Sequence, residues 1–280
     1  MLVSVFINDC PIQLALVDKL HGSISIDSIF LSKNILANKN TSKYKKIPYF
    51  FKRLIRVPFE LPFRLVWNKL IFTYKRQVIV SENRMKKFHV NNINDSIVLE
   101  YIKNKKPGLI VVSATTMVKE DLINAALKIN CVILNLHTGV SPYIKGGPSC
   151  TNWCLANNYY LIGNTVMTLD KGIDSGAIIS TELTELTGQE SLYELHKKVF
   201  DHGFDLYTRV VSSIVKSKVA LTLTPQKEIS TDGKLFYTKD WTILKVIQAY
   251  LNFLFRYKKG VRNFKLNKGV KLFPFDRDVN

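Results

Sequence analysis

The sequence predicts an α/β protein built on an open, mostly parallel, Rossmann-like sheet with helices on both faces. Two observations lead to this prediction. Short, continuous apolar runs at 109–112 and 131–134 have the composition of parallel strands that are covered on both faces. Stretches with helical spacing of apolar residues, such as 120–129 and 191–215, alternate with these runs.

The elements follow each other in a regular order. Residues 2–7 are predicted to form a strand, 11–20 a helix and 23–31 a second strand. The later predicted elements are helix 93–104, strand 109–112, helix 120–129, a strand from Val132, helix 149–157, strands 161–169 and 177–181, and helix 191–215. There is no G-x-G-x-x-G sequence after the first strand, so nothing indicates a nicotinamide or flavin dinucleotide.

The α/β alternation stops near Lys216. We therefore predict two parts, an α/β domain over residues 1–218 and a small, basic C-terminal extension over 219–280. Within the extension, a strand at 234–238 and a helix at 241–257 are expected.

Cysteine usage and hydropathy indicate the compartment. The four cysteines form no C-x-x-C pair and no histidine lies at zinc spacing from them, which predicts free thiols, a reducing environment and no metal site. The first residues lack the pattern of a secretory signal, and there is no apolar run of about 18 residues that would suit a membrane-spanning helix. A cytoplasmic protein is expected, with peripheral attachment to the inner face of the membrane as a variant.

The net charge of +18 is unevenly placed. Residues 43–87 hold 13 Lys and Arg against two Glu, and residues 239–280 hold 10 Lys and Arg against three Asp. The rest of the chain has 17 basic and 17 acidic residues. The excess of positive charge therefore lies in these two segments, outside the expected catalytic core.

The first basic segment, which we regard as an insertion at about 43–87, interleaves aromatic residues with Lys and Arg. Its prolines, Pro48, Pro58 and Pro62, predict several short pieces instead of one helix. Three interpretations remain open: packing of the aromatic residues on the core, contact with an anionic membrane surface, or contact with nucleic acid.

Two polar residues stand at the end of the strand that begins at Val132. Asn135 and His137 are two positions apart, so on a strand they point to the same side. An amide and an imidazole together can hold a carbonyl oxygen and manage a proton; the alternative is that Asn135 opens a turn and His137 is a surface histidine. Asp174 follows 37 residues after His137, in a D-x-G-x-D-x-G loop.

Asn135-x-His137, Pro142, Gly146-Gly147 and the loop 170–176 together resemble the formyltransferase family that uses 10-formyltetrahydrofolate. Methionyl-tRNA formyltransferase, glycinamide ribonucleotide transformylase and the nucleotide-sugar N-formyltransferases belong to this family. The resemblance is good over about 108–182 and extends to 1–31 only in the order of strand and helix.

The resemblance implies roles for individual residues. Asn135 and His137 would stabilise the oxyanion, and Asp174 would orient His137 and tune its pKa, with His137 or a water held by Asp174 as the base. The folate would be bound by two segments, comprising Ser113, Ala114, Thr115, Thr116, Met117, Leu169, Asp170 and Ile173. The amine substrate would meet Thr138, Tyr143, Lys145 and Gly146. For Met117 the alternative is core packing, and for Lys145 a solvated side chain.

The substrate is expected to be the amino group of a nucleotide-linked amino sugar, as in polysaccharide biosynthesis. Residues 219–280 are too few for the barrel of methionyl-tRNA formyltransferase, which argues against tRNA. The alternatives are a hydrolase that releases formate, transfer to tRNA-bound methionine, to glycinamide ribonucleotide or to a lipid-linked amino sugar, and a non-catalytic membrane- or RNA-binding protein. An apolar face on the insertion or on the 241–257 helix would equally suit a homodimer contact.

Overall fold

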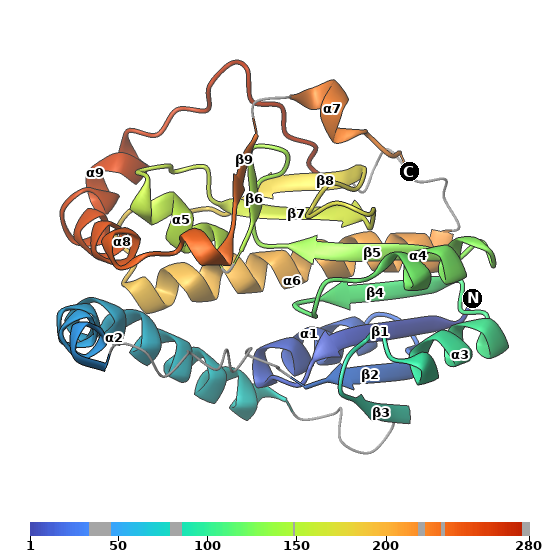
Figure 1. Ribbon diagram of the computed structural model, residues 1–280. Coiled ribbons are helices and arrows are strands. Elements are labelled where there is room, and N and C mark those ends of the chain that lie inside the picture. The colour runs from blue at the N-terminus through green and yellow to red at the C-terminus, as the bar shows by residue number, and fades with distance from the viewer. Residues whose placement is uncertain (34–45, 79–85, 148, 218–221, 231–232, 276–280) are drawn as a thin grey trace.

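A seven-stranded sheet forms the centre of the protein, with strand order β3-β2-β1-β4-β5-β7-β8 (Figure 1). The computed structural model describes residues 1–33, 46–78, 86–147, 149–217, 222–230 and 233–275. The strands are β1 (Val3–Asn8), β2 (Ser28–Ser32), β3 (Lys86–Val90), β4 (Leu109–Ser113), β5 (Val132–His137), β7 (Gly163–Thr168) and β8 (Ile178–Leu183). The first five strands of the order are parallel, and β7 and β8 are antiparallel to their neighbours. The predicted mostly parallel α/β sheet is confirmed.

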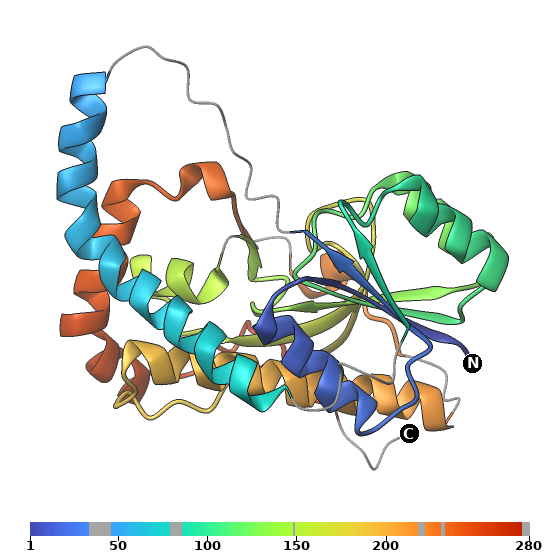
Figure 2. The ribbon, with the colours of Figure 1, turned by 90° about the horizontal axis from the view of Figure 1, so that it is seen from below.

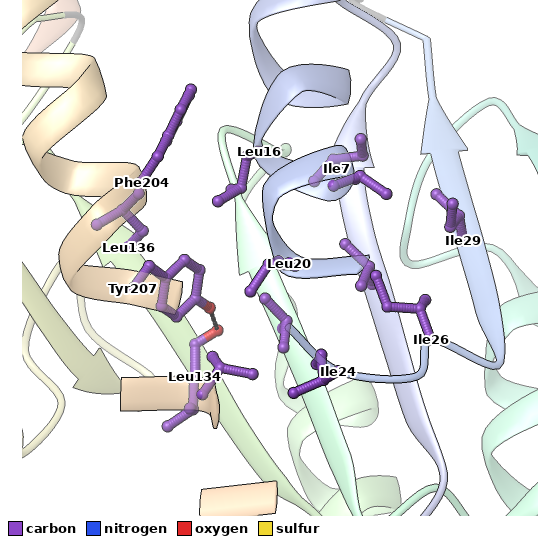
Figure 3. Packing of buried hydrophobic residues seen from close by; sticks show 14 of the residues in the cluster. Ile7, Leu16, Leu20, Ile24, Ile26, Ile29, Leu134, Leu136, Phe204 and Tyr207 are labelled. Atoms are coloured by element: carbon purple, nitrogen blue, oxygen red, sulfur yellow. Dashed lines mark hydrogen bonds between the residues drawn. The ribbon is translucent and has the colours of Figure 1, made fainter. Parts of the chain in front are cut away.

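Helices cover both faces of this sheet. Helices α1 (Pro11–His21) and α6 (Leu192–Ser217) pack on one face, and α3 (Ser96–Lys105) and α4 (Glu120–Leu127) pack on the other. Side chains of a strand alternate between the faces, so Val5 lies on the α1 and α6 side while Phe6 lies on the α3 and α4 side. Figure 3 shows the first of these cores, in which α1 and α6 enclose Leu134 and Leu136 of β5.

Helix α2 (Lys46–Gln77) is continuous, so the expectation of short pieces was wrong. Pro58 and Pro62 lie inside it. Packing supports the helix, because Leu70 and Tyr74 are buried and the Tyr74 hydroxyl donates a hydrogen bond to Asp201 of α6 at 2.7 Å. Residues 43–45 and 79–85 of the expected insertion lie outside the described residues. Residues 86 and 87 belong to β3, an edge strand that the sequence analysis missed.

The C-terminal extension contacts the sheet at several points. It contains α7 (Gln226–Ile229), β9 (Lys234–Phe236), a short 3-10 helix (Thr238–Asp240), α8 (Ile243–Phe255) and α9 (Tyr257–Arg262). Strand β9 pairs with β6 (Ile144–Gly146), and α8 packs on α5 (Cys150–Ala156) and α2. Thr224 and Phe273 each form a bridge with β8. The division expected at 218/219 falls outside the described residues and stays a prediction.

None of the helices in the described ranges is both long enough and apolar enough to cross a membrane.

Candidate active site

The end of strand β5 lies beside the end of strand β4. The two strands are parallel, and their register aligns Val112 with Asn135 and Ser113 with Leu136. Since Leu134 and Leu136 point into the core under α6, Asn135 and His137 face the opposite side of the sheet. Asn135 is half-buried and His137 is buried. Polar side chains thus stand at the carboxyl edge of the sheet, where open α/β folds bind ligands.

Tyr207 of α6 fixes β4 and β5 just before Asn135. Its hydroxyl donates a hydrogen bond to the carbonyl oxygen of Leu134 at 2.8 Å (Figure 3). The same hydroxyl accepts a hydrogen bond from the backbone N–H of Val112 at 3.1 Å. Burial raises the pKa of Tyr207 well above its usual value, so the phenol stays neutral. Helix α6 therefore sets the separation of the two strands that carry the site.

His137 and Asp174 form the centre of the site. The Nδ1 atom of His137 lies 3.3 Å from Oδ2 of Asp174, and both side chains are largely buried. The same Oδ2 accepts a hydrogen bond from the backbone N–H of Gly146 at 2.8 Å. Within the described part of the chain, Oδ1 of Asp174 has no hydrogen-bond partner. One carboxylate oxygen is thus held by the protein, and the other is left for a ligand or water.

The other ring nitrogen of His137 also faces an acceptor. Its Nε2 atom lies 3.1 Å from the carbonyl oxygen of Ile144 and 3.5 Å from Sγ of Cys150. An acceptor at each ring nitrogen favours a proton on both, which is the charged imidazolium form. Burial lowers the pKa of His137, but the Asp174 carboxylate and Cys150 outweigh burial and raise it to about 10. Burial raises the pKa of Cys150, and the neighbouring His137 lowers it by a smaller amount.

The loop after His137 leaves room for the imidazole. A Cβ atom on Gly139 would lie 2.4 Å from Nε2 of His137, so any side chain at this position would clash with the imidazole ring unless the ring moved. Thr165 of β7 holds this loop, because its hydroxyl donates to the carbonyl oxygen of Gly139 at 2.7 Å and accepts from the N–H of Ser141 at 3.0 Å. The position of His137 therefore depends on a strand that follows it in the sequence.

Asp174 lies in an unusual backbone conformation. Its φ angle is +45°, a left-handed value that Asp tolerates better than most residues. The side-chain amide of Gln226, in the C-terminal extension, donates to the backbone carbonyl oxygens of Asp174 and Gly176, both at 2.8 Å. The sequence analysis missed Gln226. Its one signal in the sequence was a polar residue directly after Pro225, which by itself does not reveal a buried contact.

The Asn135 amide is the group most open to a ligand. It is half-buried, and no hydrogen bond joins its side chain to any other described residue. It stands two residues before His137 on the same side of β5. Its N–H donors are therefore free to meet an oxygen atom that approaches the edge of the sheet.

The first predicted folate-binding segment follows β4. Ser113 is buried at the strand end, Ala114 is exposed with a φ angle of +50°, and Thr115 and Thr116 are half-buried. Met117 is 67% exposed, which excludes the alternative of core packing.

The second predicted segment follows β7. Leu169 packs partly on the core, whereas Asp170 and Ile173 are exposed. An ion pair between Lys171 and Glu120 connects this loop to the start of α4. Through this ion pair the loop meets the segment that follows β4, and each of the two carries an exposed apolar side chain, Met117 and Ile173, which suits the flat heterocycle of a folate. The residues present therefore fit this donor.

The residues predicted to meet the amine lie around β6. Thr138 and Lys145 are half-buried. The Tyr143 hydroxyl accepts a hydrogen bond from the N–H of Lys271 at 2.7 Å, so the C-terminal segment engages it. Gly146 contacts Asp174 through its backbone N–H, so it supports the carboxylate. No group of three or more His, Cys, Asp or Glu in the described ranges could hold a metal ion.

Comparisons with known proteins identify the family of the chain. A profile of the formyl transferase family matches residues 72–211, half of the chain. A methionyl-tRNA formyltransferase of Alkaliphilus oremlandii is 30% identical over 154 residues, which are 55% of this chain and 48% of that protein. That of Fusobacterium nucleatum is 27% identical over 61% of this chain and 55% of its own length. The chain belongs to the formyl transferase family, and it spans about half the length of the curated relatives it matches.

Solved structures with the same fold extend over most of the chain. A sugar N-formyltransferase from Shewanella superposes with a TM-score of 0.54 at 15% identity, over 91% of this chain and 88% of that one. A phosphoribosylglycinamide formyltransferase from Anaplasma phagocytophilum gives 0.53 at 13% identity, over 85% and 98%. At these identities the likeness concerns the fold.

Proposed function

We propose that the protein transfers a formyl group from 10-formyltetrahydrofolate to a primary amine. One observation carries this proposal: the imidazole of His137, held by Asp174, stands on the same side of β5 as the amide of Asn135, which no other described residue contacts by a hydrogen bond. Membership of the formyl transferase family supports the reaction. The donor supplies a formyl carbon bound to nitrogen, and the chain's own groups bind and activate it.

Asn135 and His137 stabilise the negative charge that develops on the formyl oxygen. The Asn135 amide donates a hydrogen bond to this oxygen, and the imidazolium of His137 supplies a nearby positive charge. Both groups are held in place before the reaction, because β5 is fixed by Tyr207 and the His137 ring by Asp174 and Ile144. Preorganised donors of this kind act strongly in a site from which water is excluded.

Asp174 manages the proton of the attacking amine. The raised pKa of His137 leaves no free lone pair on its ring at neutral pH, which argues against His137 as the base. Oδ1 of Asp174 is the remaining acceptor, and a water bound there would take the proton from the amine. The same water would return a proton to the folate nitrogen as the bond to the formyl carbon breaks.

For the amine we propose a nucleotide-linked amino sugar. Two lysines support an anionic substrate here, because Lys145 precedes Gly146, which contacts Asp174, and Lys234 lies on β9, which is paired with β6. Positive side chains near the site would attract the phosphates of a nucleotide. A second candidate is methionyl-tRNA, since the relatives found by sequence are methionyl-tRNA formyltransferases and the chain carries a net charge of +18.

The test incubates the full chain with 10-formyltetrahydrofolate and a panel of amines that includes nucleotide-linked amino sugars, glycinamide ribonucleotide and charged initiator tRNA. Mass spectrometry detects the gain of one carbonyl group on the acceptor. Gain on a nucleotide-linked sugar supports both the reaction and the substrate. Gain only on tRNA or glycinamide ribonucleotide would overturn the sugar substrate but not the reaction. Formate release without any acceptor would replace the transferase by a hydrolase.

A further inference from the structure

We propose that the outer face of α2 binds the surface of an anionic lipid bilayer. This face is defined by four exposed apolar residues and four exposed basic ones, namely Val57, Leu61, Leu65, Phe72, Arg64, Lys69, Lys75 and Arg76. Helix α2 lies at one side of the molecule, away from the α3 and α4 layer (Figures 1 and 2). The family profile begins at residue 72, so most of α2 lies outside the matched range.

The apolar residues of this face form one stripe. Leu61, Leu65 and Phe72 are separated by four and seven positions, which places them on the same side of a helix. Their exposed fractions are 46%, 58% and 55%. The opposite side of the helix carries Leu70 and Tyr74, which are buried against the core. Helix α2 therefore has a second apolar side that folding does not use.

Basic side chains lie on both flanks of the stripe. The helical period places Arg64 and Lys75 on one flank and Lys69 and Arg76 on the other. The guanidinium of Arg76 lies over the ring of Phe72, 4.2 Å from its centroid. Glu60 is the one acidic residue in the sequence of α2. Apolar residues at the centre with Lys and Arg at the sides are the pattern of helices that lie in a bilayer interface.

Helix α8 adds apolar surface next to α2. The two helices pack through Tyr250, whose ring centroid lies 6.3 Å from that of Phe59 and 6.4 Å from that of Phe63. Beyond this contact, α8 leaves Leu244, Leu251, Leu254 and Phe255 exposed. Two neighbouring helices therefore each present large apolar side chains to solvent.

The basic residues of this face favour an anionic bilayer over the other possible binding partners. A second copy of the chain would bring like charges on α2 together, which is unfavourable. A nucleic acid would pair with the basic flanks but leave Leu61, Leu65 and Phe72 exposed. An anionic bilayer would contact both the basic flanks and the apolar stripe. Its headgroups attract the Lys and Arg, and the boundary of its acyl chains accepts the apolar side chains.

The experiment is flotation of the full chain with two kinds of vesicle, phosphatidylcholine alone and phosphatidylcholine mixed with phosphatidylglycerol. We expect binding to the mixed vesicles only, and a steep fall in binding when salt rises from about 0.1 M to about 0.5 M, because screening shortens the reach of surface charge. Absence of binding to the mixed vesicles, or equal binding to both kinds, would overturn the proposal.

Two sets of variants locate the binding face. Leu61→Ser with Leu65→Ser and Phe72→Ser should reduce binding by roughly tenfold for each side chain removed. Arg64→Gln with Lys75→Gln and Arg76→Gln should reduce it by about fivefold for each charge. The control substitutions are on α3 and α4: Ile97→Ser with Leu127→Ser for the apolar set, and Lys103→Gln with Lys105→Gln for the basic set.

Circular dichroism checks that each variant folds, and the basic set provides a second test if the apolar set does not fold. Sedimentation velocity is measured on the same proteins without vesicles. Controls that weaken binding as much as the α2 variants would overturn the assignment to α2. So would a dimer in solution that the apolar variant dissociates while vesicle binding persists.

Discussion

The charged side chains at the edge of β5 find their partners within the protein, whereas those on the outer face of α2 are exposed to solvent. Around His137, each ring nitrogen faces an acceptor from the chain, and Oδ2 of Asp174 is held by two groups. On the outer face of α2, Leu61, Leu65 and Phe72 are exposed to solvent. A buried charge must find its partners within the protein, whereas an exposed apolar stripe indicates a partner outside it. Substitutions in the two regions should therefore affect different properties.

The largest effect is expected at Asn135, whose side-chain amide has no hydrogen-bond partner among the described residues. Asn135→Ala should lower kcat by about 10²- to 10³-fold, because it removes a preorganised hydrogen bond to the oxyanion. Steady-state assays of formyl transfer measure this, with the exposed Asn124→Ala of α4 as the control. Equal rates for Asn135→Ala and the unmodified protein would contradict the role given to Asn135.

The second effect concerns pH and the His137–Asp174 pair. The pKa of His137 is about 10 in the folded protein, against about 6.5 for an unfolded chain. The stability from the charged ring is therefore fully present below pH 6.5 and is lost as the pH rises through 10. Between pH 6 and pH 10.5 we expect a loss of roughly 4 to 5 kcal/mol in the free energy of unfolding, a loss that His137→Gln does not show. Denaturant titrations of both proteins from pH 6 to pH 10.5 measure the difference, and parallel pH profiles would contradict the raised pKa.

A third, smaller effect is expected where the C-terminal extension holds the Asp174 loop. Gln226→Met keeps the length of the side chain but leaves two buried carbonyl oxygens without donors. The free energy of unfolding should fall by about 1 to 3 kcal/mol. If Gln226 positions Asp174, kcat of the folded protein should also fall by about tenfold while KM for the folate changes little.

The exposed Gln189→Met is the control for this variant. A loss of stability with unchanged kcat would show that Gln226 has a structural role only.

The smallest effect is expected on the outer face of α2. Leu65→Ser should change the free energy of unfolding by less than about 0.5 kcal/mol and leave kcat for a dissolved amine unchanged. Leu70→Ser, on the buried side of the same helix, should cost about 3 kcal/mol or more. Thermal or denaturant unfolding compares the two, and equal losses would mean that the outer face is packed in solution.

Much of the fold could be predicted from local pattern. Short apolar runs at 109–112 and 131–134 became β4 and β5, and the helical spacing of 191–215 became α6. The prediction failed for α2, where prolines indicated short pieces. Proline weakens a helix locally, but burial of Leu70 and Tyr74 supports the helix from outside the segment. The edge strand β3 carries few apolar residues, so its sequence gave no strong signal.

The sequence by itself placed Asn135 and His137 on one side of a strand, because side-chain alternation is a local property of the backbone. The tertiary structure decided the state of His137. Its proton is fixed by Asp174, Ile144 and Cys150, which lie on other elements, and the Asp174 loop is held by Gln226, 52 residues further on. Spacing along the chain determines the direction of a side chain, but only the packed fold determines which charges and acceptors surround it.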